Sequence, residues 1–489
     1  METPSPLRSA GLAAPSHSRA RGALPVFAAI LALATALRVR GGWNDLWLDE
    51  IWSLAVARDV RGPLDVFTHI HHEINHYGNT LWLWVAGWHG DWIGYRVPSL
   101  VAGVGSVALA GWIARRRGSA AVVFTLLVAS CSYVLVLYSS EVRGYSMLVF
   151  ASYLSYVLLD EYLRSDRWAL GAALSVVEVL GLVSHLLFES VLLAAIAASA
   201  FSFWRRRLPP GGAARRLVLC HALPLACLAA LYVVDLREIV EGGGGTATGS
   251  LIADYGTALA WALGAPVSPA AQLVGCVLAV VVLDAGVRLV ARDDPPAAAF
   301  FVCAILVFPV LLAVARSSPV LYTRHFILPI AFLTILLGFD LAALYERGRG
   351  YRWAAAGLLV LFAIANGAHL RDLFRYGRGQ NGAALRFILE HSGPGPVTIA
   401  ADDDFRIRRV VEFYAAEQEA GARIEYQPRG TWQGAGPEWL IVNRDSFERA
   451  ISRGEQIQDE TGRRFDLVAS FPAAPLAGLH WFVYRNESR

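Results

Sequence analysis

Apolar stretches of about 20 residues recur from residue 24 to about residue 370, and this pattern constrains the fold more than any other feature. A helix needs about 20 apolar residues to cross the hydrocarbon core of a bilayer. Only 17% of the residues are charged, whereas soluble domains carry about 25%. We therefore expect a polytopic α-helical membrane protein. The net charge of +3 is small for 489 residues and indicates no nucleic-acid partner.

Arg-rich turns between the apolar stretches predict the topology, because cytoplasmic loops are enriched in Arg. With these turns inside, residues 1–23 form a cytoplasmic tail and the C-terminus lies outside. We interpret the first span as uncleaved, although a signal peptide would begin similarly. The chain contains no Lys, which is typical of a GC-rich bacterial genome, so we expect a bacterial cytoplasmic membrane. About eleven spans are expected, near residues 24–40, 97–114, 119–138, 144–160, 168–186, 188–204, 217–234, 270–290, 297–315, 324–344 and 353–369.

The first outer segment, residues 41–96, holds seven of the fifteen Trp residues. Trp prefers the headgroup region of a membrane. We interpret "NTLWLWVAGWHG" in this segment as a helix that lies along the interface. A second short helix is expected to begin at Asp49 or Glu50, since acidic residues favour a helix N-terminus. Helix capping is therefore one interpretation of this acidic pair, and catalysis is the other.

Polar and ionisable residues gather at the outer ends of the expected spans. Such groups are costly at the membrane and usually face a protein cavity. A cavity with carboxylates, Arg and His suits an anionic, lipid-linked substrate and a proton that must be removed. The residues in question are Asp49, Glu50, His69, His71, His72, Glu73, Asn75, His76, Arg96, Glu141, Arg143, Tyr145, His185, Glu189, Tyr322, Arg324 and His325.

Four motifs in order, "WLDEIW", "YRVPSL", "YSSEVRGYSML" and "YTRHFILPI", resemble those of the GT-C membrane glycosyltransferases. The resemblance covers about residues 24–370. It is strongest to the protein O-mannosyltransferase-like superfamily (glycosyltransferase families 39 and 83), which includes the bacterial 4-amino-arabinose lipid A transferases. Many relatives carry an "HPP" motif where this chain has "HHEINHYGNT", so acceptor specificity does not carry over.

The resemblance implies an inverting transfer of a sugar from a polyprenyl-phosphate donor to a hydroxyl of a lipid, polysaccharide or protein. Asp49 matches the general base, and Glu50 would orient the acceptor or Asp49. Arg side chains hold phosphate bidentately. No metal or other cofactor is expected, because mannosyltransferase-like relatives are generally metal-independent. The donor phosphate would be held by Arg96, Arg143, Arg324 and Tyr322, and the substrate would be contacted by Asn75, His76, Glu141, Tyr145 and His185.

Other interpretations of these residues stay open. Arg96 and Arg324 begin spans, so each could reach toward lipid headgroups. Glu141 and Arg143 could form a local pair, and His185 could be an ordinary buried histidine. The spacing of His69, His71 and His72 fits no common metal site and suggests a wet loop.

Two alternative functions also remain. An inactive glycan-binding or scaffolding homologue would have lost the base, and Asp49 is present. A transporter would need polar or broken spans at mid-membrane depth.

Beyond residue 370 the composition becomes more charged, and strand-like and helix-like segments alternate. We therefore expect a small extracytoplasmic α/β domain over residues 371–489. In "ADDDF" (401–405) we expect a helix cap rather than a metal site. The domain lacks a Gly-rich phosphate loop, so acceptor docking or partner binding is its expected role. The stretch "EGGGGTATGS" (241–250) is expected to be a flexible outer loop that could close over the donor.

Overall fold

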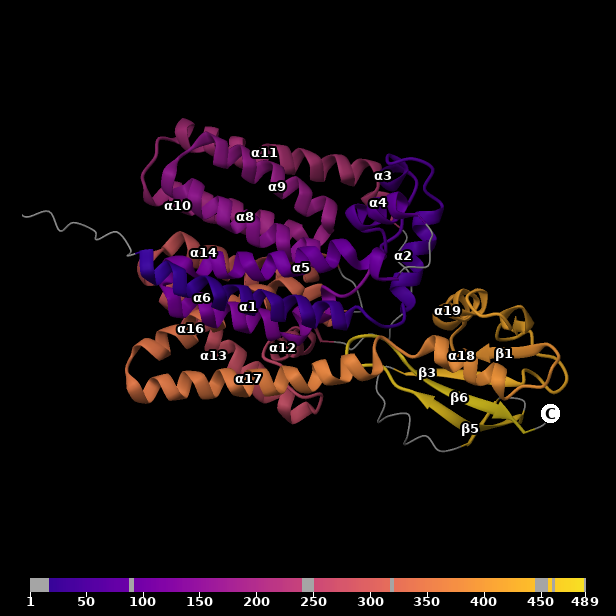
Figure 1. Cartoon of the computed structure of the whole chain (residues 1–489). Helices are drawn as coiled ribbons and strands as arrows, with labels where there is room; N and C mark the ends of the chain where they lie inside the picture. The colour runs from indigo at the N-terminus through magenta and orange to yellow at the C-terminus, as the bar shows by residue number, and fades with distance from the viewer. Residues whose placement is uncertain are drawn as a thin grey trace, which may run out of the picture.

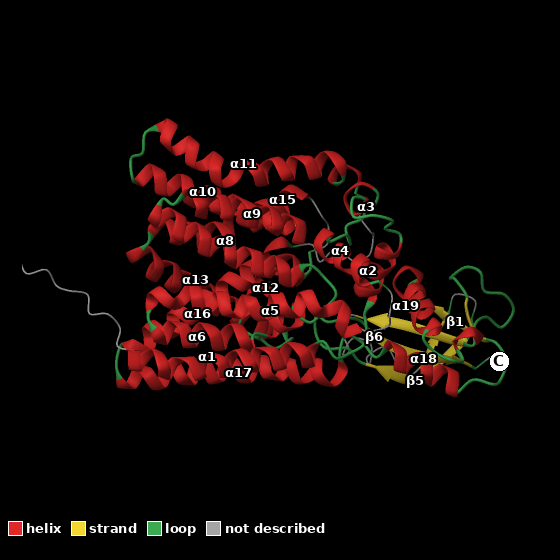
Figure 2. Cartoon of the chain, turned by 45° about the horizontal axis from the view of Figure 1, so that its top comes forward, coloured by secondary structure: helices red, strands yellow, loops and turns green. Residues whose placement is uncertain are grey.

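The computed structural model describes residues 17–87, 92–239, 250–316, 321–444, 456–459 and 462–487. A bundle of long helices forms most of the molecule, and a smaller domain with a β-sheet lies at one end of it (Figure 1). The strands are confined to that smaller domain (Figure 2). The expected loop 241–250 and residues Trp88–Asp91 fall almost entirely outside the described part of the chain.

Each expected span overlaps a helix or a pair of consecutive helices. Within the described ranges, eight helical segments are long and apolar enough to cross a membrane. The other three expected spans coincide with α6–α7, α8 and α9, of which α6 and α9 have only 13 and 17 residues. The bundle contains α1 (His17–Gly41), α5 (Trp92–Ala114), α6 (Ser119–Cys131), α7 (Tyr133–Tyr138), α8 (Tyr145–Ser165), α9 (Trp168–Ser184), α10 (Glu189–Arg205), α11 (Pro210–Val234), α12 (Leu251–Ala262), α13 (Pro269–Asp293), α14 (Pro295–Val302), α15 (Phe308–Arg316), α16 (Ile327–Glu346) and α17 (Arg349–Tyr376).

Helix α16 is the core of the bundle, with 78% of its most apolar stretch buried. It packs against α6, α13 and α17. Small residues allow this close approach, as is common between membrane helices. A Cβ at Gly338 of α16 would lie 2.3 Å from the side-chain oxygen of Thr125 on α6. The helix was not expected as a core element, because its sequence is simply apolar on every side.

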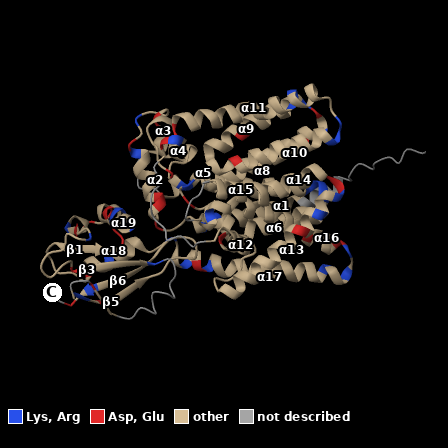
Figure 3. Cartoon of the chain, turned by 180° about the vertical axis from the view of Figure 1, so that it is seen from behind, with Lys and Arg blue, Asp and Glu red and all other residues tan. Residues whose placement is uncertain are grey.

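Within the bundle, charged residues lie mostly at its two ends (Figure 3). At the end away from the sheet, ion pairs join turns that are distant in sequence. Arg116 pairs with Asp160 (3.2 Å), Arg164 pairs with Asp294, and Arg216 pairs with Asp166 (2.5 Å). These contacts confirm that the Arg-rich turns share one end of the bundle.

The opposite end carries three short helices from the first outer segment: α2 (Leu48–Arg58), α3 (Asp65–Thr68) and α4 (Tyr77–Ala86). The two short helices expected in this segment are thus confirmed as α2 and α4. A 3₁₀ turn, Thr323–Phe326, precedes α16 at the same end. The polar residues of the four motifs therefore meet where α2, α5, α8 and α16 begin.

The C-terminal domain begins only after α17, which continues past residue 370 to Tyr376. Its six-stranded sheet has the order β2-β1-β3-β6-β5-β4, parallel between β2, β1 and β3 and antiparallel elsewhere. Asp403 caps α19 by accepting a hydrogen bond from the backbone N–H of Arg406, as expected. The elements are α18 (Asn381–Glu390), β1 (Val397–Ala401), α19 (Asp404–Ala416), β2 (Ile424–Tyr426), β3 (Trp439–Arg444), β4 (Gln456–Gln458), β5 (Arg464–Phe471) and β6 (His480–Asn486).

Candidate active site

The acidic pair lies in the first turn of α2, and its two carboxylates have different surroundings. Trp47 is the N-cap residue, and its backbone N–H donates to the Glu50 carboxylate (3.2 Å). Consecutive residues of a helix point about 100° apart, so Asp49 faces another direction. The capping interpretation therefore holds for Glu50 and does not apply to Asp49.

Glu50 is fully buried against Arg96. The guanidinium donates to both carboxylate oxygens, at 3.0 and 2.8 Å, and the N–H of Val142 donates to one of them at 2.7 Å. Burial opposes ionisation, but Arg96 and Arg378 together lower the pKa of Glu50 below its usual value. Glu50 is therefore an ionised anchor for the start of α2.

The position of Arg96 does not favour the phosphate contact expected from the sequence. It is completely buried, and besides Glu50 it donates to the backbone carbonyls of Gly42, Asn44 and Asp45. An arginine has five N–H donors, and the described contacts occupy them. Its alternative expected role, reaching toward headgroups, does not fit its burial either.

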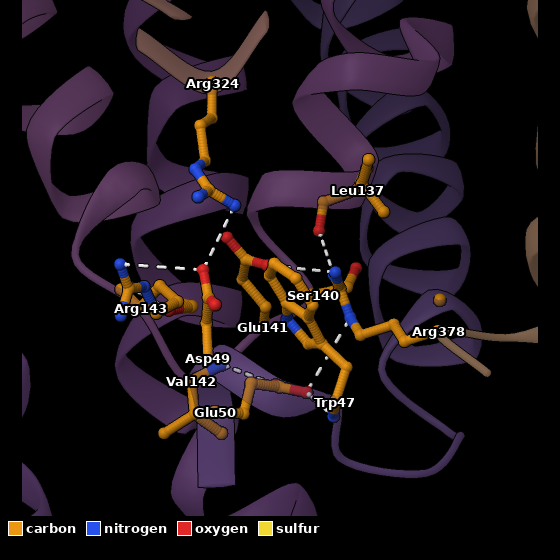
Figure 4. Close-up of polar contacts among 12 residues, drawn as sticks. Trp47, Asp49, Glu50, Leu137, Ser140, Glu141, Val142, Arg143, Arg324 and Arg378 are labelled. Carbon is orange, nitrogen blue, oxygen red and sulfur yellow. Dashed lines mark hydrogen bonds and ion pairs between the residues drawn. The ribbon is translucent and has the colours of Figure 1, made fainter. Parts of the chain in front are cut away.

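Asp49 lies between two arginines from distant parts of the chain (Figure 4). Its carboxylate is 3.1 Å from Arg324, which precedes α16, and 4.0 Å from Arg143, in the turn before α8. Asp49 is 9% exposed, so it is reachable from the surface, unlike Glu50. Arg324 also lies over the ring of Tyr322, with 4.4 Å between the guanidinium carbon and the ring centre. A carboxylate and two cations thus share the rim of one site.

Glu141 does not pair with Arg143, so that alternative from the sequence is wrong. Its Oε2 instead accepts a hydrogen bond from Arg378 (2.9 Å). Its Oε1 is buried and has no hydrogen-bond partner among the described residues. Burial raises the pKa of Glu141 to about 7, although Arg378 opposes the shift.

Three rings cluster beside Arg143 in edge-on and tilted contacts. The ring centres of His76 and His185 are 4.2 Å apart, and that of Tyr145 is 5.2 Å from His76 and 4.8 Å from His185. Nε2 of His76 is 3.3 Å from Arg143, and its Nδ1 accepts from the backbone N–H of Gly144. Burial and Arg143 hold the pKa of His76 well below its usual range, so this histidine is neutral.

The structure does not bring every expected residue to the site. Asn75 is buried in its own loop, where it donates to the carbonyls of Val66 and Ile70 and accepts from Thr80. Among the described residues, no group of three or more His, Cys, Asp or Glu could hold a metal ion.

The three clustered histidines have separate partners rather than a common one. His69 is exposed beside Asp65, and His71 lies 2.7 Å from Asp235. His72 stacks on Trp52.

Arg378 is the main residue that the sequence analysis missed. It follows the last span and is 1% exposed, yet it contacts residues from the first and third motifs. The available signal was its place between two glycines, Gly377 and Gly379, directly after the apolar stretch.

With this geometry described, the whole chain was compared with known proteins. No protein-family model and no curated protein matches the sequence. Two crystal structures of ArnT from Cupriavidus metallidurans, one bound to undecaprenyl phosphate and one in the apo state, are similar along nearly their entire length. TM-scores are 0.51 and 0.52, with 13% sequence identity, and the alignments cover 95% of this chain and 98% of ArnT. The chain has the fold of ArnT.

The ArnT fold confirms the architecture that the four motifs indicated. The C-terminal domain expected from the composition is confirmed by the six-stranded sheet. At 13% identity the likeness concerns the fold. The roles of individual residues depend on the geometry of this site.

Proposed function

We propose that this protein is an inverting glycosyltransferase that uses a polyprenyl-phosphate sugar as donor and a hydroxyl group as acceptor. The observation that carries the proposal is the contact of Asp49 with Arg324 and Arg143 at the end of an ArnT-like bundle. One ArnT structure holds undecaprenyl phosphate, which supports a donor of this class. A base and two cations are the groups that such a transfer needs.

Asp49 takes the proton of the acceptor hydroxyl while that oxygen attacks the anomeric carbon. The bond from this carbon to the phosphate oxygen breaks, and polyprenyl phosphate leaves with the electron pair. Attack from the opposite face inverts the anomeric centre. A positioned carboxylate typically accelerates such a step by about 10²–10⁴-fold.

Arg143 and Arg324 stabilise the charge that develops on the leaving phosphate. Preorganised cations act most strongly where charge appears in the transition state. The donor phosphate competes with Asp49 for Arg324, so donor binding draws this arginine away and frees the carboxylate to act as base. Because two guanidinium groups supply the positive charge, we propose that the reaction needs no metal ion.

Glu50 and Arg96 have supporting roles in this proposal. Both are completely buried and hydrogen-bonded to each other, so they hold α2 and do not touch substrate. The cluster of three rings lies next to Arg143 and forms one wall of the substrate site. Its members are His76, Tyr145 and His185. The site would face the outside of a bacterial cytoplasmic membrane, because the Arg-rich turns gather at the other end.

Transfer by purified full-length protein in detergent tests the proposal. The donors are synthetic undecaprenyl-phosphate mannose and undecaprenyl-phosphate 4-amino-arabinose, with an envelope lipid extract as acceptor and released undecaprenyl phosphate as the readout. Asp49→Asn should abolish acceptor-dependent release. Asp59→Asn, on the exposed end of the same helix, is the matched control and should leave it unchanged. Normal release by a folded Asp49→Asn protein would refute Asp49 as the base. Absence of release by the wild-type protein with both donors would refute the transferase, and the inactive scaffold would then become the better interpretation.

A further inference from the structure

The chain makes an unusual turn where the last long helix of the bundle meets the C-terminal domain. Helix α17 ends at Tyr376, and Gly377 and Gly379 have φ angles of +63° and +128°. Residues other than glycine rarely adopt such φ angles. The two glycines turn the backbone so that Arg378, between them, points into the protein and is buried.

Arg378 lies between two carboxylates of the candidate site (Figure 4). It donates to Glu141 (2.9 Å) and to the carbonyl of Leu137 (2.5 Å), and its Nε is 4.0 Å from Glu50. Two like charges buried close together repel, and each would otherwise be driven to take up a proton or move. The guanidinium between them keeps both in place.

The C-terminal domain itself holds the backbone of this arginine. The N–H of Ala474 donates to the carbonyl of Gly377 (2.9 Å). Gly478 packs so closely that a Cβ there would lie 1.9 Å from the carbonyl oxygen of Arg378. Both contacts come from the loop before β6, so the position of Arg378 depends on the folded domain.

The same domain also contacts α2, the helix that carries Asp49, in its middle and at the residues just before it. At the beginning of α2, the Tyr414 hydroxyl donates to the carbonyl of Leu46 (2.8 Å). Further along, the guanidinium of Arg409 on α19 lies 3.7 Å from the ring centre of Trp52. Together with Arg378, which lies near Glu50, the domain thus contacts α2 and the residues before it at three points.

We propose that the C-terminal domain is an integral part of the catalytic centre and that Arg378 is its positioning residue. Through Glu50 and Glu141 it fixes α2 and the turn after α7, so that Asp49 and Arg143 stay beside each other at the candidate site. This inference rests on the proposed glycosyl transfer. It assigns the domain a role in assembling the site instead of the acceptor docking expected from the sequence.

Arg378→Met removes the charge and keeps much of the side-chain volume. We expect kcat to fall by about 10²-fold, the typical effect of a 1 Å misplacement at a reacting centre. The donor KM should stay within about twofold, because Arg378 does not contact the cations assigned to phosphate. Arg378→Lys retains the charge without the planar fork and should recover part of kcat. The matched control is Arg371→Ala, an exposed arginine on α17 that should behave as wild type.

Turnover is counted per folded molecule, from the monodisperse fraction in size-exclusion chromatography. If Arg378→Met folds poorly, the Lys variant carries the test through its kcat alone. Wild-type kcat in either folded variant would overturn the inference, as would a raised donor KM with unchanged kcat, which would indicate a direct phosphate contact. The wild-type protein, measured in parallel, separates the two ideas: if it releases no undecaprenyl phosphate from either donor, the proposed function itself has failed.

Discussion

The neighbours Asp49 and Glu50 should respond in opposite ways to removal of their charge. In Asp49→Asn the lost ion pair with Arg324 lies at the rim of the site, where the side chains are 13% and 21% exposed. A pair that keeps some contact with solvent contributes less than a fully buried one. Asp49 caps no helix, and Asn is isosteric, so the folded protein should be almost as stable as wild type. Its transfer rate should fall by about 10²–10⁴-fold, because the base is lost.

Glu50→Gln should mainly affect stability. Four N–H donors converge on this carboxylate: two from Arg96 and one each from the backbones of Trp47 and Val142. A Gln amide places its own NH₂ among these donors and leaves Arg96 buried without a counter-charge. Breaking a buried ion pair costs about 3–5 kcal/mol, so the unfolding temperature should drop clearly. Turnover per remaining folded molecule should fall less than in Asp49→Asn.

For each variant, stability and transfer can be measured on the same preparation. Thermal unfolding in detergent is followed by Trp fluorescence, and transfer is normalised to the folded fraction. The assignment of roles would be refuted if Asp49→Asn lost as much stability as Glu50→Gln. It would also be refuted if Glu50→Gln were as stable as wild type, since the buried network would then contribute nothing.

Three further outcomes are expected. Burial raises the pKa of Glu141 from 4.5 to about 7 in the folded protein. The stability that the protonated group contributes is therefore fully present below pH 4.5 and is lost as pH rises through about 7. Glu141→Gln should flatten this fall of the unfolding temperature with pH. Arg324→Ala should weaken donor use, measured by donor titration, without unfolding the protein. Arg96→Ala should unfold it, which size-exclusion profiles of both variants would show. In a cysteine-free background, Cys at the exposed position of Phe405 should react with an impermeant maleimide in intact spheroplasts, and Cys at exposed Trp204 should not; the reverse pattern would overturn the orientation.

Much of the fold could be predicted because membrane spans are encoded locally. Each apolar stretch satisfies its own backbone hydrogen bonds as a helix, so residues 24–40 or 217–234 identify themselves without knowledge of their neighbours. Helix α12 was missed because it follows a Gly-rich stretch and is too short to span. The end of α17 was misplaced by six residues because its last turns are polar and project beyond the apolar stretch.

The site was predicted as a set of residues but not as a set of roles. Asp49 and Glu50 are adjacent acids, and nothing in the local sequence indicates which of them pairs with Arg143 and Arg324. Arg96 and Arg324 both begin a span, yet one is buried against Glu50 and backbone carbonyls and the other lies at the rim. Arg378 could not be linked to the site at all, since its partner Glu141 is 237 residues away.

That separation has a consequence for how the protein is made. Synthesis proceeds from the N-terminus at about 5–20 residues per second, so Arg378 is added roughly 10–50 seconds after Glu141. Throughout this interval every helix up to α16 can insert, while Glu50 and Glu141 lack the guanidinium that holds them together. A chain interrupted before residue 378 retains Asp49, Arg143 and Arg324 and still lacks an ordered site. Under the proposed function, activity would thus be reserved for chains in which the C-terminal domain has been made, and a shorter chain would not act on the lipid carriers around it.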